Sequence, residues 1–241
     1  MKRGVYLLPN SLTLCGMFFG FYAVISSLNG DFKRAAWSIL IAIVFDGLDG
    51  WVARLTSTTT KFGLELDSLS DLVAFGIAPS VLVYTWALAP LGRIGAGASF
   101  LYVACGALRL ARYNIQMVST EKLSFTGMPI PAAASIVATL VIFYHSIDRS
   151  PPSGSIGVLL LTLTISILMI STLRFHGAKE IDLKKRKPFW VLVFFVLLIF
   201  LILLHPPTSL FFFAMAYLFW GIIENTYLFY RKKRLKGSEK E

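Results

Sequence analysis

The sequence predicts an all-α, polytopic membrane protein with about eight transmembrane helices and a short interfacial helix at the N-terminus. The mean hydropathy is +0.70 and 56% of the 241 residues are hydrophobic, which is more apolar than a soluble domain. The apolar runs are continuous, and each approaches the ~20 residues that a helix needs to cross a bilayer. Strands of a membrane barrel would instead alternate apolar and polar residues.

The first part of the chain predicts the interfacial helix and five spans. Residues 1–9 combine Lys2 and Arg3 with a short apolar run, a pattern typical of a helix in the membrane interface. Pro9-Asn10-Ser11 predicts the start of the first span, and turn-forming or charged residues separate the spans that follow. The five predicted spans are residues 12–28, 33–55, 67–88, 94–113 and 129–147.

The rest of the chain predicts three further spans, at residues 156–173, 189–204 and 209–230. A basic loop at 174–187 and a basic tail close this part of the sequence. We therefore expect a core of residues 1–150, followed by residues 151–241 as three added helices with a basic loop and tail.

The basic residues account for the net charge of +10 and predict the orientation of the chain. They gather in loops and at the termini, which favours contact with anionic lipid over binding to nucleic acid. With eight spans, the basic runs at 184–187 and 231–236 fall on the same side as the connection 56–62. The positive-inside rule then places both termini and this connection in the cytoplasm, with the protein in the cell membrane. The opposite loops carry only Lys33, Arg34, Arg93 and Arg149.

Four aspartates interrupt the second and third predicted spans. Asp46 and Asp49 are spaced i, i+3, and Asp67 and Asp71 are spaced i, i+4, so each pair lies on one helix face. An antiparallel pair of helices would bring the two faces together. Unpaired carboxylates are costly in a membrane, and four together require a neutralising cation. The oxygen-only ligand set favours Mg²⁺ or Mn²⁺, with Ca²⁺ as another possibility, and four carboxylates could hold two ions.

Gly50 and Arg54 lie one and two helical turns after Asp46. Glycine lets a bulky ligand approach the backbone closely. The guanidinium of arginine forms paired hydrogen bonds that suit phosphate. The stretch therefore predicts a metal-held phosphate site.

These residues resemble the signature of the CDP-alcohol phosphotransferase family, Asp-x2-Asp-Gly-x2-Ala-Arg-x8-Gly-x3-Asp-x3-Asp. The resemblance implies a CDP-linked lipid as substrate, the four aspartates as metal ligands, and Asp71 also as the general base. It further implies a homodimer. The residues implied in binding the CDP-lipid are Gly50, Ala53, Arg54, Thr60 and Gly63, with Asn10 and Thr13 from the first span. For Asn10 and Thr13, an ordinary helix cap is the alternative.

The acceptor alcohol is predicted from two later stretches. Arg109, Arg112 and Asn114 end the fourth span, and residues 125–134 read FTGMPIPAAA. Together they resemble membrane-embedded phosphatidylserine synthases of the bacterial and archaeal type. The resemblance implies that the lipid is CDP-diacylglycerol or an ether-lipid analogue, and that the three residues bind L-serine. An arginine suits the serine carboxylate. Membrane anchoring of the two arginines is the alternative interpretation.

Two other functions fit parts of the pattern. The same chemistry with glycerol 3-phosphate or inositol phosphate as acceptor would also use arginines near the site. A cation transporter would also contain aspartates within its membrane-spanning helices. Transport favours carboxylates at the bilayer midplane on broken helices, whereas these aspartates cluster toward one face, beside an arginine.

Overall fold

The computed structural model describes residues 7–56, 60–118, 127–147, 152, 154–173 and 204–238. The N-terminal part of the expected interfacial helix, the basic loop 174–187 and the expected span 189–204 up to residue 203 lie outside these residues. The described residues contain helices and their connections, and no strand.

The helices follow one another through short turns over most of the described chain. A single continuous helical rod runs from residue 61 to 91 and contains α3, η1, α4, η2 and η3. Two of its stretches, η1 and η2, are π-helical. The elements are α1 (Leu7–Leu28), α2 (Phe32–Leu55), α3 (Lys61–Asp71), η1 (Leu72–Ile77), α4 (Ala78–Val83), η2 (Tyr84–Leu88), η3 (Ala89–Leu91), α5 (Arg93–Val118), α6 (Ile130–Ser146), α7 (Ile156–Ile170) and α9 (Pro206–Ser238).

The helices confirm the predicted class of a polytopic membrane protein. Within the described chain, five helices are long and apolar enough to cross a membrane, and α6 and α7 are shorter apolar helices. Several predicted boundaries were wrong by a few residues. Helix α1 already includes Leu7, rather than beginning after Pro9. A proline is tolerated in the first turn of a helix, because the N–H groups of that turn have no partner within the helix and the missing one is not needed. The third helix begins at Lys61, where Thr60 caps its N-terminus.

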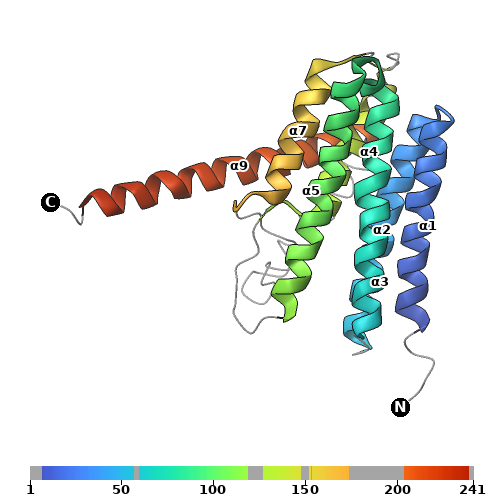
Figure 1. Ribbon diagram of the computed structural model, residues 1–241, viewed down its shortest axis with the longest axis horizontal. Helices are drawn as coiled ribbons and strands as arrows, with labels where there is room; N and C mark the ends of the chain where they lie inside the picture. Colours follow the sequence, from blue (N-terminus) through green and yellow to red (C-terminus); the bar gives the residue numbers. More distant parts are fainter. Residues whose placement is uncertain are drawn as a thin grey trace.

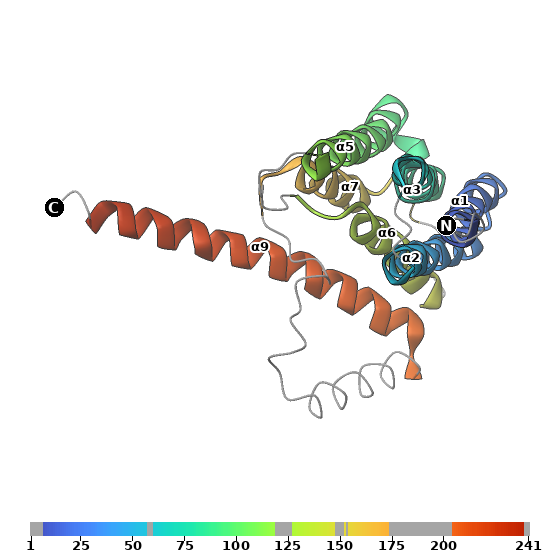
Figure 2. The same cartoon turned by 90° about the horizontal axis from the view of Figure 1, so that it is seen from below.

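Helices α1 to α7 stand side by side in one bundle (Figure 1). The most extensive contact between described helices is that of α1 with α2, and α1 also packs along the rod from α3 to α4. Viewed from below, α6 lies among α2, α3, α7 and α9 (Figure 2). Helix α9 packs against α6, crosses the bundle rather than running alongside it, and extends beyond it. The apolar part of α9, Pro206–Thr226, is the least buried of the candidate spans among the described residues.

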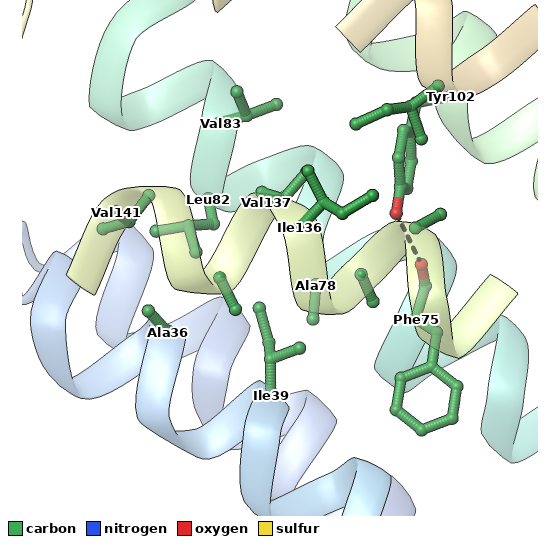
Figure 3. Close-up of a cluster of buried hydrophobic side chains, with 14 of the residues drawn as sticks. Ala36, Ile39, Phe75, Ala78, Leu82, Val83, Tyr102, Ile136, Val137 and Val141 are labelled. Atoms are coloured by element: carbon green, nitrogen blue, oxygen red, sulfur yellow. Dashed lines mark hydrogen bonds between the residues drawn. The ribbon is translucent and has the colours of Figure 1, made fainter. Parts of the chain in front are cut away.

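Small side chains bring the helices close together at the centre of the bundle. Gly20 of α1 faces Ala74 of η1, and a Cβ on Gly20 would lie 2.5 Å from the Ala74 Cα. Ala36, Ala78 and Ile39 are fully buried in the same cluster (Figure 3). Such close packing of small residues is how membrane helices associate, since lipid provides little hydrophobic driving force between them.

The π-helical turn at η1 lies where a proline enters the rod. Pro79 has no N–H to donate to the carbonyl of Phe75, four residues earlier. The Tyr102 hydroxyl of α5 donates to this Phe75 oxygen instead, at 3.3 Å (Figure 3). A buried carbonyl that is thus satisfied lets the irregular turn persist inside the membrane. The irregular turn begins at Leu72, immediately after Asp71.

Candidate active site

Three aspartates from two helices converge, as the sequence predicted. Asp46 and Asp49 come from the C-terminal half of α2, and Asp67 comes from α3. Each offers one carboxylate oxygen, and these oxygens all lie within 4.8 Å of one another. Asp49 is 5% exposed, whereas Asp46 and Asp67 are half-buried. The aspartate-bearing faces of α2 and α3 therefore point toward one another.

The aspartates line a narrow cavity between α1, α2 and the start of the rod. Asp71 lines the same cavity but does not belong to the group of three within 4.8 Å. The cavity walls combine acidic, small and apolar side chains. They are Thr13, Gly16, Ala42, Asp46, Asp49, Asp67, Ser70, Asp71, Ala74 and Phe75.

The donor atoms of this group suit a hard divalent cation. The three converging residues supply carboxylate oxygens alone, without histidine or cysteine. Mg²⁺, Mn²⁺ and Ca²⁺ prefer such oxygen ligands, while structural zinc sites use sulfur and nitrogen. The cluster of Asp46, Asp49 and Asp67 could therefore hold a metal ion.

Hydrogen bonds from α3 to two neighbouring helices accompany this arrangement. Ser70 donates from its hydroxyl to the Thr13 carbonyl of α1 at 3.0 Å, in a buried position. Ser68 accepts a hydrogen bond from the Asn114 amide of α5 at 2.9 Å. The helix that carries Asp67 and Asp71 is thus tied to α1 on one side and to α5 on the other.

The residues predicted to bind the nucleotide lie in two places near the cavity. Arg54 is exposed, and a Cβ on Gly50 would lie 3.8 Å from its Nη1 atom. At the start of α3, the Gly63 N–H donates to the Thr60 hydroxyl at 3.0 Å. A Cβ on Gly63 would lie 3.4 Å from the Asn10 Oδ1 atom, so α1 and α3 meet there.

Three of these predictions can be refined. Asn10 is not the cap of the first helix, because α1 already begins at Leu7. Thr13 is buried and lines the cavity with the aspartates, and its hydroxyl donates to the Pro9 carbonyl at 3.1 Å. Ala53 is half-buried near the end of α2.

Of the residues predicted to bind the acceptor, Arg109 is the one that lies within electrostatic range of Asp71. Its buried Nε atom has no hydrogen-bond partner among the described residues. Arg112 is half-buried one turn further along α5. Asn114 bonds to Ser68, and none of the three lines the cavity itself.

Two neighbours of the site were absent from the sequence prediction. Ser70 lies between Asp67 and Asp71 in sequence, and a hydroxyl placed between two aspartates was the available signal. Tyr217 of α9 lies within electrostatic range of Arg109. No local pattern around Tyr217 could have indicated this, because about a hundred residues separate the two side chains in the sequence.

Known proteins support this reading of the site. The sequence model for CDP-alcohol phosphatidyltransferase matches residues 6–170. A Helicobacter pylori (strain J99) protein named CDP-diacylglycerol–serine O-phosphatidyltransferase is 39% identical over 93% of each chain. An archaetidylserine synthase from Methanothermobacter thermautotrophicus is 34% identical over 70% of this chain and 69% of its own. A Bacillus subtilis protein with the same name as the first is 34% identical over 73% of this chain and 96% of its own. With this match over residues 6–170 and four aspartates around one cavity, the chain belongs to the CDP-alcohol phosphatidyltransferase family.

Proposed function

We propose that this chain transfers the phosphatidyl group of CDP-diacylglycerol, or the archaetidyl group of an ether-lipid analogue, to L-serine with release of CMP. The observation that carries the proposal is the convergence of Asp46, Asp49 and Asp67 within 4.8 Å beside Asp71. The choice of serine follows the names of relatives that match up to 93% of the chain.

The four aspartates are the proposed ligands for one or two Mg²⁺ or Mn²⁺ ions. A bound divalent cation would offset negative charge on the phosphoryl oxygens and on the departing CMP. Toward the nucleotide, Gly50 leaves room beside the backbone and Arg54 offers its guanidinium to a phosphate. The proposed remaining contacts to the CDP-lipid are Ala53, Thr60, Gly63, Asn10 and Thr13.

Asp71 is the proposed general base. Its carboxylate accepts the proton of the serine hydroxyl, and the serine Oγ forms a bond to the β-phosphorus. The bond from that phosphorus to the bridging oxygen breaks, and CMP leaves with the electron pair. Arg109, close enough to Asp71 to interact with its charge, is suited to binding the serine carboxylate, with Arg112 and Asn114 nearby on α5.

The proposal extends to the whole chain. The basic loops and tail favour an orientation with both termini and the site on the cytoplasmic side of the cell membrane. The catalytic core is residues 1–150, and the functional protein is a homodimer. Family membership favours this enzymatic function over the cation-transport alternative, since the family model covers all four aspartates.

An acceptor assay tests the proposal. Purified protein receives CDP-diacylglycerol, Mn²⁺ and labelled serine, and we expect CMP and a serine lipid in equal amounts. Chelation of the metal should abolish transfer, and added Mn²⁺ should restore it. Parallel reactions contain glycerol 3-phosphate or inositol phosphate. Robust turnover of either one, without incorporation of serine, would refute the serine assignment while leaving the family chemistry intact.

A further inference from the structure

Two serines lie between the aspartates of α3, in the sequence Asp67-Ser68-Leu69-Ser70-Asp71. Successive residues of an α-helix are rotated by about 100°, so the two aspartates share a face and the serines flank it at about 80° on either side. The structure gives each flank a separate partner. Ser70 donates to the Thr13 carbonyl of α1 at 3.0 Å, and Asn114 of α5 donates to the Ser68 hydroxyl at 2.9 Å.

The apolar residues of the same helix are not deeply buried, and Leu66 is the best covered of its leucines, at half-buried. Leu64 is 46% exposed and Leu69 is 59% exposed, so these side chains face outward from the bundle. The hydrogen bonds on the two flanks are directional, and at least one is fully buried. Together with the packing of the rest of the rod, they therefore fix the rotation of the helix, and with it the direction of the Asp67 and Asp71 carboxylates.

We infer that Ser68, Ser70 and Asn114 are positioning residues that hold Asp67 and Asp71 against the aspartates of α2. In this role Asn114 acts on the site through Ser68 rather than by touching the acceptor alcohol. The inference rests on the proposed function, since it assigns these side chains to the support of a metal-binding, catalytic helix.

The hydrogen bonds that Ser68 and Asn114 already make fit this role. The Ser68 hydroxyl donates to the Leu64 carbonyl of its own helix at 3.0 Å while it accepts from the Asn114 amide. Its only proton and one of its two acceptor positions are therefore used within the fold. Partners that orient metal-binding side chains typically contribute about 10- to 100-fold to metal affinity or activity. We expect losses of this size when either half of the pair is removed.

A double-mutant cycle with Mn²⁺ as the probe tests the inference. Ser68→Ala, Asn114→Ala and the double variant are purified, and Mn²⁺ binding is measured by titration without substrate. We expect each single variant to weaken Mn²⁺ binding about 10- to 100-fold. The double variant should lose no more Mn²⁺ affinity than the single variant with the larger loss. In kinetic assays kcat should fall together with the Mn²⁺ affinity, while the KM for serine changes less than twofold.

Matched variants separate positioning from a general loss of stability. Ser80 forms the same kind of interhelical bond, to the Ser99 carbonyl at 2.7 Å, in the half of the rod far from the aspartates. Ser80→Ala should lower thermal stability but leave Mn²⁺ affinity unchanged. Ser68→Thr keeps the hydroxyl and should retain the affinity.

Two results would overturn the inference. Additive losses in the cycle would show that Ser68 and Asn114 act independently. A raised KM for serine in Asn114→Ala, with unchanged Mn²⁺ affinity, would show that Asn114 contacts the acceptor directly. Because the Mn²⁺ titration requires no turnover, the cycle is decisive even where the serine assay detects no transfer.

Discussion

Asp71 differs from the other three aspartates in its position. It lines the same cavity, yet its carboxylate lies outside the group within 4.8 Å, and it lies within electrostatic range of Arg109 as well as of the other aspartates. This placement leaves an oxygen available for a proton from the acceptor. General-base catalysis contributes about 10²- to 10⁴-fold, so Asp71→Asn should lower kcat by that factor. Steady-state kinetics and a separate CDP-lipid binding assay measure the effect.

The control for this variant is its affinity for the CDP-lipid, which should stay within a few-fold of the wild type because Asp46, Asp49 and Asp67 remain. Turnover of Asp71→Asn at the wild-type rate would contradict the proposed general-base role.

Arg109 provides a second test at the level of one residue. Arg109 is half-buried, and its buried Nε atom has no partner among the described residues, so a ligand carboxylate could fill that position. A hydrogen bond to a charged group is worth about 1.5–3 kcal/mol, which corresponds to roughly 10- to 100-fold in affinity. Arg109→Ala should raise the KM for serine by this factor, as measured at saturating CDP-lipid.

The matched control is Arg93→Ala, which removes an exposed arginine at the opposite end of α5 and should leave both KM values unchanged. Equal increases in the KM for serine and for the CDP-lipid in Arg109→Ala would indicate a structural role instead.

At the scale of the elements, the site depends on how closely α1 approaches η1. Gly20 and Ala74 form this contact, and a Cβ on Gly20 would lie 2.7 Å from the Ala74 Cβ and closer still to its Cα. Overpacking of this kind costs about 1–3 kcal/mol. Gly20→Ala should therefore lower the thermal unfolding temperature and weaken Mn²⁺ binding, because α1 also carries Thr13 and its bond to Ser70.

Gly97→Ala in α5 is the control for this contact. No atom lies within 4 Å of a Cβ at Gly97, and alanine favours a helix over glycine by up to about 1 kcal/mol. This variant should be as stable as the wild type or more so. Equal unfolding temperatures for Gly20→Ala and Gly97→Ala would show that α1 and η1 can separate without cost.

At the scale of the whole molecule, charge predicts how the chain crosses the membrane. The aspartate site lies toward the end of the bundle where α3 begins, and the turn between α1 and α2 lies at the other end (Figure 1). The basic runs favour the first end as cytoplasmic. In a variant without Cys15 and Cys105, Ser238→Cys should react with an impermeant thiol reagent in inside-out vesicles only.

Asn29→Cys, in the turn between α1 and α2, is the matched variant and should react in right-side-out vesicles only. Reaction of both cysteines from the same side would contradict the predicted orientation. Intact vesicles without an introduced cysteine provide the background signal.

Periodicity determined the helices well and their ends less well. The spacing of Asp46 and Asp49, and of Asp67 and Asp71, placed each pair correctly on one face of a helix. The start of the first helix was misjudged, because Pro9 is equally compatible with a helix start and with a first turn. Pro79 marks the π-helical turn at η1 in the sequence, but the Tyr102 hydroxyl that donates to the Phe75 carbonyl there lies far away in the sequence, so no local pattern revealed that bond.

The sequence by itself determined the membrane class, the family and the aspartate group, because these follow from hydropathy and from fixed spacings along a helix. The tertiary structure alone decided which residues of different helices meet, such as Ser68 with Asn114 and Ser70 with Thr13. It also placed Arg109 within electrostatic range of Asp71 and Tyr217. The physical reason is the distance along the chain over which a sequence pattern carries information. Helical periodicity relates residues within a few turns, whereas contacts between helices depend on how small side chains let whole helices approach and rotate against one another.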